Sequence, residues 1–210
     1  MKLAYLVDRK VYDTKMSRVR FQQIEAIAKQ VPVVWSGPGW DNWDPNLPPC
    51  QNVAALGVEA VVTYEVGDLE HCKVPVITQY NEADHTDRVE RFVRHNGVAL
   101  VVFHHANDLE RYAHWADEQG AGTRGPTRVH IPHCADPLVY HDYRQSKDID
   151  ILVAGNMSEQ YYPFRRRLKA IAERVLARRN WKVVTLPHPG YTLPPREGTR
   201  VGEDFALVIN

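Results

Sequence analysis

The sequence predicts an α/β protein in which helices cover a sheet of parallel strands. The first observation is that short apolar runs alternate with segments whose apolar residues recur at helical spacing. The second is the composition, because 44% apolar and 25% charged residues in a chain of 210 are ordinary globular values. The third is a break at 132–148, after which the alternation restarts. Together these observations indicate one Rossmann-like domain followed by the first part of a second.

The expected strands are short apolar runs that end at glycine, proline or polar residues. In the first part of the chain they cover 2–8, 31–35, 59–65, 74–80, 98–103 and 128–131. The run at 98–103 is almost wholly apolar, which predicts a central strand covered on both faces. Asp8, Arg9 and Lys10 follow the first strand and are expected to form a loop.

The expected helices lie between these strands, an arrangement that requires parallel pairing and right-handed crossovers. The first is capped by Ser17, and its apolar residues share one face: Phe21, Ile24, Ala28 and Val31. Shorter helices are expected at 51–56 and 86–95, and one capped by Asp108 at 108–119.

The second part of the chain follows a polar segment that contains prolines. We expect a first domain at 1–140, a linker at 141–147 and the beginning of a second domain at 148–210. In the second domain, strands at 149–154 and 181–186 flank a helix at 163–179. This division explains a length that lies between those of one and two α/β domains.

Charge and cysteine content narrow the class of protein. The 26 basic and 26 acidic side chains balance, so nothing indicates a nucleic-acid polymer as partner. Residues 144–210 nevertheless hold 12 basic and 7 acidic side chains, which suits either an anionic ligand or a solvated face. The three isolated cysteines, Cys50, Cys72 and Cys134, are typical of reduced thiols, which predicts a cytoplasmic protein. No apolar run is long enough to span a membrane.

Ligands of open α/β sheets bind beyond the carboxyl ends of the strands, so the loops at that edge carry the candidate residues. After the second strand, Gly37 and Gly39 allow close backbone approach to a ligand, and Trp40 can stack on a sugar. The alternative is a simple Gly-Pro turn with an exposed tryptophan. Glycine patterns for dinucleotides or for a P-loop do not occur.

Polar side chains after the fourth and fifth strands are candidate catalytic groups. Asp84 and His85 follow the fourth strand, and His104 follows the fifth. A carboxylate or an imidazole there can act as general base or orient a hydroxyl. Asp84 is equally a good helix N-cap. His104 and His105 point to opposite sides of an extended chain, so they are not expected to share a metal.

The second part offers a phosphate site. Gly155 and Asn156 end its first strand and precede a helix, whose free N–H groups can bind an anion. Arg165 lies in the first turn of that helix, where its charge opposes the helix dipole unless an anion compensates. An ordinary surface arginine is the alternative. His188 follows the next strand at the same edge.

No metal site is expected. His130 and His133 have a metal-like spacing, but their side chains point to opposite faces of a strand. Asp148 and Asp150 form an Asp-x-Asp pair at the start of a strand, which is the wrong end for chemistry in an open sheet.

Four segments carry a resemblance to a known family. They are the first strand with its basic loop, the turn from Ser36 to Trp40, the stretch from Ile131 to Pro137, and the stretch from Asp148 to Asn156 followed by Tyr162-Pro163-Phe164-Arg165. The last is the most specific of the four. The chain resembles GT-B-type glycosyltransferases, close to the spore-maturation-like and family-1-like group, over most of its length.

The resemblance implies two Rossmann-like domains that face each other across a cleft, the first binding the acceptor and the second a nucleotide-sugar donor. It implies transfer of a sugar without a metal or other cofactor. Asp84, His85 or His104 would act as base or orienting group. Residues of both parts would bind the substrate or the donor: Gly37, Gly39, Trp40, Gly155, Asn156, Arg165 and His188.

In such enzymes the second domain is longer, so we expect the one here to be incomplete. The sequence is then a piece of a longer chain, a naturally short relative, or one part of an assembly with a second chain. An alternative hypothesis is a non-catalytic nucleotide- or sugar-binding module that docks a partner chain. The donor base, the sugar and the acceptor stay open, including an acceptor that contains a nucleobase.

Overall fold

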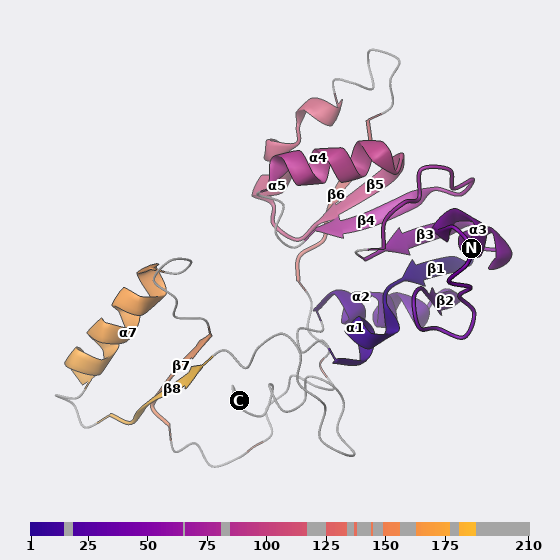
Figure 1. The fold of residues 1–210 in the computed structure, drawn as a ribbon. Helices are drawn as coiled ribbons and strands as arrows, with labels where there is room; N and C mark the ends of the chain where they lie inside the picture. The colour runs from indigo at the N-terminus through magenta and orange to yellow at the C-terminus, as the bar shows by residue number, and fades with distance from the viewer. Residues whose placement is uncertain are drawn as a thin grey trace. The chain divides into compact units, whose positions relative to one another are not determined.

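The computed structural model describes residues 1–14, 19–64, 66–80, 85–116, 125–133, 137, 144, 149–155, 163–176 and 181–187. The chain divides into two compact units, which are treated separately below (Figure 1). The first unit holds Met1–Asp13 and Arg18–Ala135, and the second holds Thr14–Ser17 and Asp136–Asn210. The domain limits of 1–140 and 148–210 remain a prediction.

The first unit contains a six-stranded sheet in which all neighbouring strands are parallel (Figure 1). The strands are β1 (Leu3–Leu6), β2 (Val33–Ser36), β3 (Ala60–Thr63), β4 (Val76–Tyr80), β5 (Val98–Phe103) and β6 (Thr127–His130). Their order is β2-β1-β3-β4-β5-β6. The α/β prediction of a Rossmann-like parallel sheet is therefore confirmed for this unit.

Strand β5 is not the central strand that its apolar sequence predicted. It lies between β4 and the edge strand β6. Val76 pairs with Val98 and Ile77 with Leu100, which leaves Ala99 as an extra residue on β5. Such a bulge shifts the alternation of side chains along the strand. After it, Val101 and Phe103 point into one core, and His104 comes to lie on the opposite face.

Helices cover both faces of this sheet. They are α1 (Arg9–Thr14), α2 (Val19–Ala28), α3 (Pro49–Ala55), α4 (Thr86–His95) and α5 (Asn107–Arg111). Figure 1 shows α1 and α2 on one face, with α4 and α5 on the other. Along β1 and the following Val7 the side chains alternate. Ala4 and Leu6 belong to the same core cluster as the buried residues of α4, and Tyr5 and Val7 to the same cluster as those of α2. No helix in the described part of the chain is long and apolar enough to cross a lipid bilayer.

Two of the predicted local structures are wrong. Arg9 and Lys10 do not form a loop, because helix α1 begins at Arg9 directly after β1. Asp108 does not cap a helix: Ala106 occupies the N-cap of α5, and Asp108 is a buried side chain inside it that pairs with Arg111. The helix expected at 108–119 ends at Arg111, and 117–119 lie outside the described residues.

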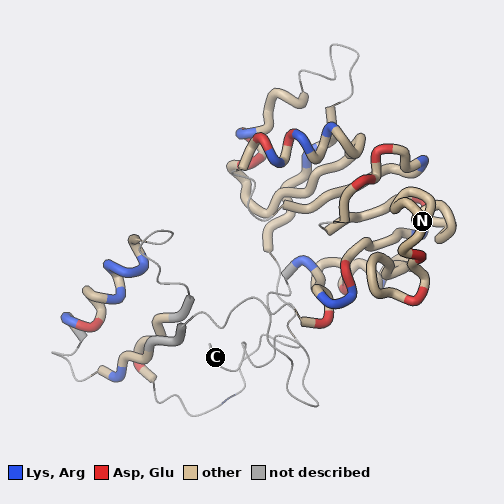
Figure 2. The backbone as a smooth tube through the Cα atoms, viewed as in Figure 1, with Lys and Arg blue, Asp and Glu red and all other residues tan. Residues whose placement is uncertain are grey.

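The second unit contains a parallel pair, β7 (Ile151–Gly155) and β8 (Val183–Pro187), with α7 (Pro163–Leu176) between them in sequence. Asp150 lies just before β7, and its Oδ2 accepts the backbone N–H of Lys182 at 2.6 Å. Helix α7 is strongly basic (Figure 2). Its apolar stripe is solvent-exposed: Phe164, Leu168, Ile171 and Val175.

We expect the thiol of Cys72 to react slowly with alkylating reagents. Burial, and secondarily the neighbouring Cys50, raise the pKa of Cys72 to about 11. Since only the thiolate is nucleophilic, alkylation at pH 8 is expected to be about 100-fold slower than for a thiol at the ordinary value of 9.0. Mass spectrometry after timed iodoacetamide labelling measures the rate at each cysteine. Equal modification of Cys72 and a short reference peptide would contradict the prediction.

Candidate functional site

A cleft lies at the carboxyl edge of the first unit's sheet, where the strand order reverses. The chain runs from β1 outward to β2 and then returns to β3 on the other side of β1. Ligands of open α/β sheets bind at such a reversal. A cavity of about 360 Å³ is present there. We call it the switch-point cleft, and its described lining residues are Asp8, Val11, Pro38, Trp43, Pro49, Tyr64, Val66 and Gly67.

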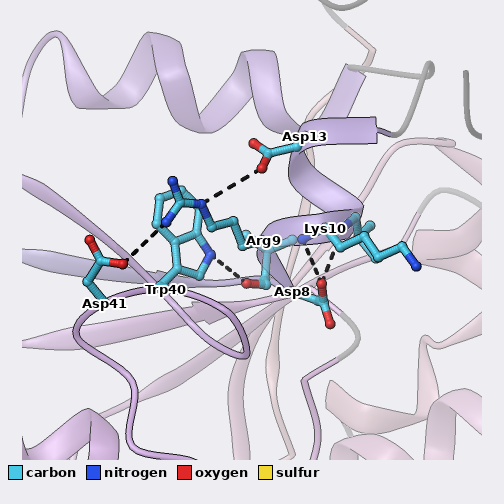
Figure 3. A network of polar contacts seen from close by, with 8 residues as sticks. Asp8, Arg9, Lys10, Asp13, Trp40 and Asp41 are labelled. Atoms are coloured by element: carbon cyan, nitrogen blue, oxygen red, sulfur yellow. Dashed lines mark hydrogen bonds and ion pairs between the residues drawn. The ribbon is translucent and has the colours of Figure 1, made fainter. Parts of the chain in front are cut away.

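Asp8 joins the end of β1 to the start of α1. Its Oδ1 accepts the backbone N–H of Lys10 at 2.8 Å and that of Val11 at 3.3 Å (Figure 3). These are the free N–H groups of a helix N-terminus, the position that binds phosphate in many nucleotide-binding sheets. The protein's own carboxylate therefore fills that position in the first unit.

Arg9 and Trp40 belong to a network beside the cleft (Figure 3). The Trp40 indole N–H donates to the Val7 carbonyl at 2.9 Å. The Arg9 guanidinium lies 5.4 Å from the centre of the Trp40 ring and forms ion pairs with Asp13 and Asp41. Trp40 also stacks on Trp35, so its ring is held in place by the fold. Whether Trp40 also contacts a sugar remains a prediction.

Gly37 is explained by the close approach of the chain to itself. It has φ +130°, and a Cβ built on it would lie 2.4 Å from the Val7 carbonyl oxygen. At Gly39, with φ +83°, an added Cβ would lie 3.2 Å from the Cβ of Arg9. The glycines at 36–39 thus allow the chain at the end of β1 to lie directly against the turn after β2. This close approach requires glycine even without a ligand.

Gly37→Ala is expected to destabilise the first unit by about 3 kcal/mol, from backbone strain and a clash with main-chain atoms that cannot rotate away. Gly57→Ala is the matched control, because Gly57 also has positive φ (+58°) but no atom lies within 4 Å of a Cβ built there. Gly57→Ala is expected to lower the free energy of unfolding by about 1 kcal/mol. Urea unfolding followed by circular dichroism gives both values. Equal losses would contradict the clash.

A second polar group lies at the same edge, at the ends of β4, β5 and β6. We call it the His104 cluster: Gln23, Gln79, His104, His105 and His133. Gln79 donates to Gln23 Oε1 at 3.2 Å, and Gln23 donates to the Pro132 carbonyl at 3.3 Å. The His133 ring stacks on His104 with 4.7 Å between centres, and His105 meets His133 edge-on.

His104 is the buried centre of this cluster, with only 3% of its surface exposed. Its Nδ1 lies 2.8 Å from the Ile131 carbonyl, which can only accept, so the proton is assigned to Nδ1. Nε2 then carries a lone pair, and it has no hydrogen-bond partner among the described residues. A buried polar atom without a hydrogen-bond partner lowers the free energy of unfolding by about 1–3 kcal/mol. His104 is therefore a neutral imidazole with an unused basic nitrogen.

The surroundings hold the pKa of His104 below its ordinary value of 6.5. Burial is the largest cause, and the positive or titrating groups of His133, Arg20 and His105 act in the same direction. The hydrogen bond to Ile131 opposes them. Burial likewise lowers the pKa of His133, with His105 and Arg20 contributing. His104 and His133 are therefore both uncharged at neutral pH.

A lowered pKa in the folded state predicts that acid destabilises the first unit through His104. The unfolded chain binds the proton more readily, so the stabilisation is present above pH 6.5 and is lost as the pH falls below it. The free energy of unfolding is expected to fall by at most about 1.4 kcal/mol per pH unit. Urea unfolding of the wild type and of His104→Asn between pH 7 and pH 5 measures it. Parallel pH curves for the two proteins would contradict it.

Several predicted residues belong to neither of these two groups or fall outside the described residues. His85 is exposed at the N-cap of α4 and makes no side-chain capping bond. Gly155 ends β7, and Arg165 is exposed in the first turn of α7. Asp84, Asn156 and His188 lie outside the described residues.

Sequence reasoning missed Gln23 and Gln79. Both are buried. Gln23 lies away from the apolar face predicted for its helix, so hydrophobic periodicity could not point to it. Within the described ranges, no group of three or more His, Cys, Asp or Glu side chains could hold a metal ion.

The chain was compared with known proteins at three levels. No protein-family model, no curated protein sequence and no solved structure matched it. The fold itself defines the class of protein, an α/β protein with a Rossmann-like parallel sheet. The switch-point cleft and the His104 cluster are its two candidate functional groups.

Proposed function

We propose that the chain is a GT-B-type glycosyltransferase, or its N-terminal part, that transfers a sugar from a nucleotide-sugar donor to an acceptor hydroxyl. The observation that carries this proposal is His104, a neutral, buried imidazole at the carboxyl end of β5 whose Nε2 lone pair is not engaged by any residue that the structure describes. An imidazole in that state is suited to accept a proton. The four sequence segments that resemble this family are the second support.

In this reaction the acceptor oxygen forms a bond to the anomeric carbon as the bond from that carbon to the nucleotide diphosphate breaks. The acceptor hydroxyl loses its proton to Nε2 of His104, and the departing diphosphate takes the electron pair of the broken bond. The negative charge that develops on the diphosphate needs electrostatic stabilisation. Gly155, Asn156 and Arg165 would supply it, with Asp84 or His85 orienting the acceptor and His188 beside the donor.

The distribution of charge supports a nucleotide site in the second unit. In the first unit, Asp8 already occupies the helix N-terminus that follows β1, so a phosphate is repelled there. In the second unit, α7 begins with three consecutive arginines (Arg165, Arg166 and Arg167) and follows a strand that ends in Gly155. The donor is therefore assigned to the second unit and the acceptor to the first.

Titration of the full chain with UDP-, GDP- and TDP-glucose tests the proposal. One of them is expected to bind saturably, and Arg165→Gln is expected to weaken that binding about 10-fold, the effect of losing one charge-assisted contact. Arg91→Gln, at an exposed position of α4, is the control and is expected to leave the affinity unchanged. Failure of all three to bind a folded chain would overturn the proposal.

A non-catalytic module that docks a partner chain is the second candidate. The exposed apolar stripe of α7 favours it, because Phe164 alone leaves 70% of its surface in contact with solvent. Under this reading no nucleotide sugar binds, and Arg165→Gln leaves partner binding unchanged. The titration above therefore separates the two candidates.

A further inference from the structure

The switch-point cleft has the size and position of a ligand-binding site. None of the residues described as lining it belongs to the His104 cluster. Its volume of about 360 Å³ falls within the range of small-molecule sites in proteins. It lies beyond the carboxyl ends of the neighbouring strands β1 and β3, from which the chain continues toward opposite edges of the sheet, and open α/β sheets bind ligands at such a place. Topology and shape thus identify the same place independently.

The charge of the cleft excludes an anion. Asp8 is the only charged side chain among the described residues that line it. One carboxylate oxygen of Asp8 accepts two backbone N–H groups, and the other has no partner among the described residues (Figure 3). The nearby Arg9 side chain is engaged with Trp40, Asp13 and Asp41, so it does not neutralise Asp8.

The walls of the cleft are apolar. Val11, Pro38, Pro49 and Val66 contribute aliphatic surface, and Trp43 contributes an indole. Tyr64 adds an aromatic ring that is buried and held beneath the Arg20 guanidinium at 4.6 Å. A ligand that fits must therefore bury a compact apolar or aromatic body and present a hydrogen-bond donor to one carboxylate.

We propose that the switch-point cleft binds an amine, a compact molecule with an aromatic or aliphatic body whose ammonium group pairs with Asp8. The ammonium donates to the free carboxylate oxygen while the body packs against Trp43, Pro49 and Val66. If the first unit binds the acceptor, which rests on the proposed function, the acceptor carries such an amine in addition to its reacting hydroxyl. The cleft itself does not depend on that function.

Benzylamine, benzyl alcohol and benzoate provide matched probes, because they share one ring and differ in charge. Binding to the full chain is measured at pH 7 by amide NMR shifts, with Val11, Tyr64 and Gly67 as reporters of the cleft. Benzylamine is expected to bind at least 10-fold more tightly than benzoate, with benzyl alcohol between them. The change in tryptophan fluorescence on ligand addition gives a second readout, and it is expected to be lost in Trp43→Phe although the other four tryptophans remain.

Asp8→Asn separates charge from fold, because asparagine also caps helices. This variant is expected to unfold like the wild type and to lose the preference for benzylamine over benzyl alcohol, about a 10-fold effect. Glu110→Gln, at an exposed carboxylate of α5 outside the cleft, is expected to keep the preference. Benzoate binding as tightly as benzylamine, or shifts that avoid the cleft residues, would overturn the site. The amine-binding measurement contains no nucleotide sugar. A failure of benzylamine to bind is therefore distinct from a failure of sugar transfer.

Discussion

Replacing His104 with asparagine is expected to lower the rate of sugar transfer by about 100- to 10,000-fold, the usual contribution of a general base. The asparagine amide nitrogen lies where Nδ1 lay, so it can still donate to the Ile131 carbonyl, but nothing replaces Nε2. Donor affinity is expected to stay within about 2-fold because the donor is assigned to the second unit. Release of nucleotide diphosphate under saturating donor measures the rate.

The pH profile distinguishes a base from a structural residue. His104 has a pKa below 6.5, so the basic form predominates at neutral pH and the rate is expected to be level there. The rate is expected to fall only below pH 6.5, and the variant is expected to lose this acid limb. His71→Asn, at an exposed histidine, is the control. Full activity in His104→Asn would exclude His104 as the base.

The sequence predicted most of the strands because each is an apolar run closed by a residue that cannot continue it. Helix α4 was predicted at 86–95, the range that the structure shows, since its apolar residues recur on one face. Helix α1 was missed for the opposite reason. It has six residues and no apolar stripe, and it is held by the Asp8 cap and by Tyr12, whose ring packs on Phe21 and Trp35. Tertiary contacts of this kind leave no periodic signal.

The candidate site was predicted only in part. His104 was found because it follows an apolar strand, and the structure adds why its nitrogen is basic: the Ile131 carbonyl comes from a neighbouring strand end that is 27 residues away. The switch-point cleft was not found, because alternating strands and helices establish parallel pairing but not which strands are neighbours. Only the return of β3 to the side of β1 opposite β2 creates it.

Trp115→Ala is expected to destabilise the first unit by about 4 kcal/mol, the cost of removing a large buried aromatic side chain. Trp115 is completely buried in the core between α4 and the sheet. Its ring lies 4.6 Å from the centre of Tyr112 and 6.3 Å from that of Phe103. Its indole N–H donates to the Glu90 carboxylate at 2.9 Å. The Phe103 ring is held by β5 and the Tyr112 ring is itself completely buried, so neither is free to fill the space.

Two further variants divide that loss into packing and hydrogen bonding. Trp115→Phe keeps an aromatic ring and is expected to cost about 1–2 kcal/mol, since Glu90 retains contacts to His114 and Arg94. Leu47→Ala, at an exposed leucine, is expected to cost less than about 0.5 kcal/mol. Urea unfolding at pH 7 gives all three values. If Trp115→Ala cost no more than Trp115→Phe, the ring would not be part of the core, and the packing of α4 on β5 would have to be revised.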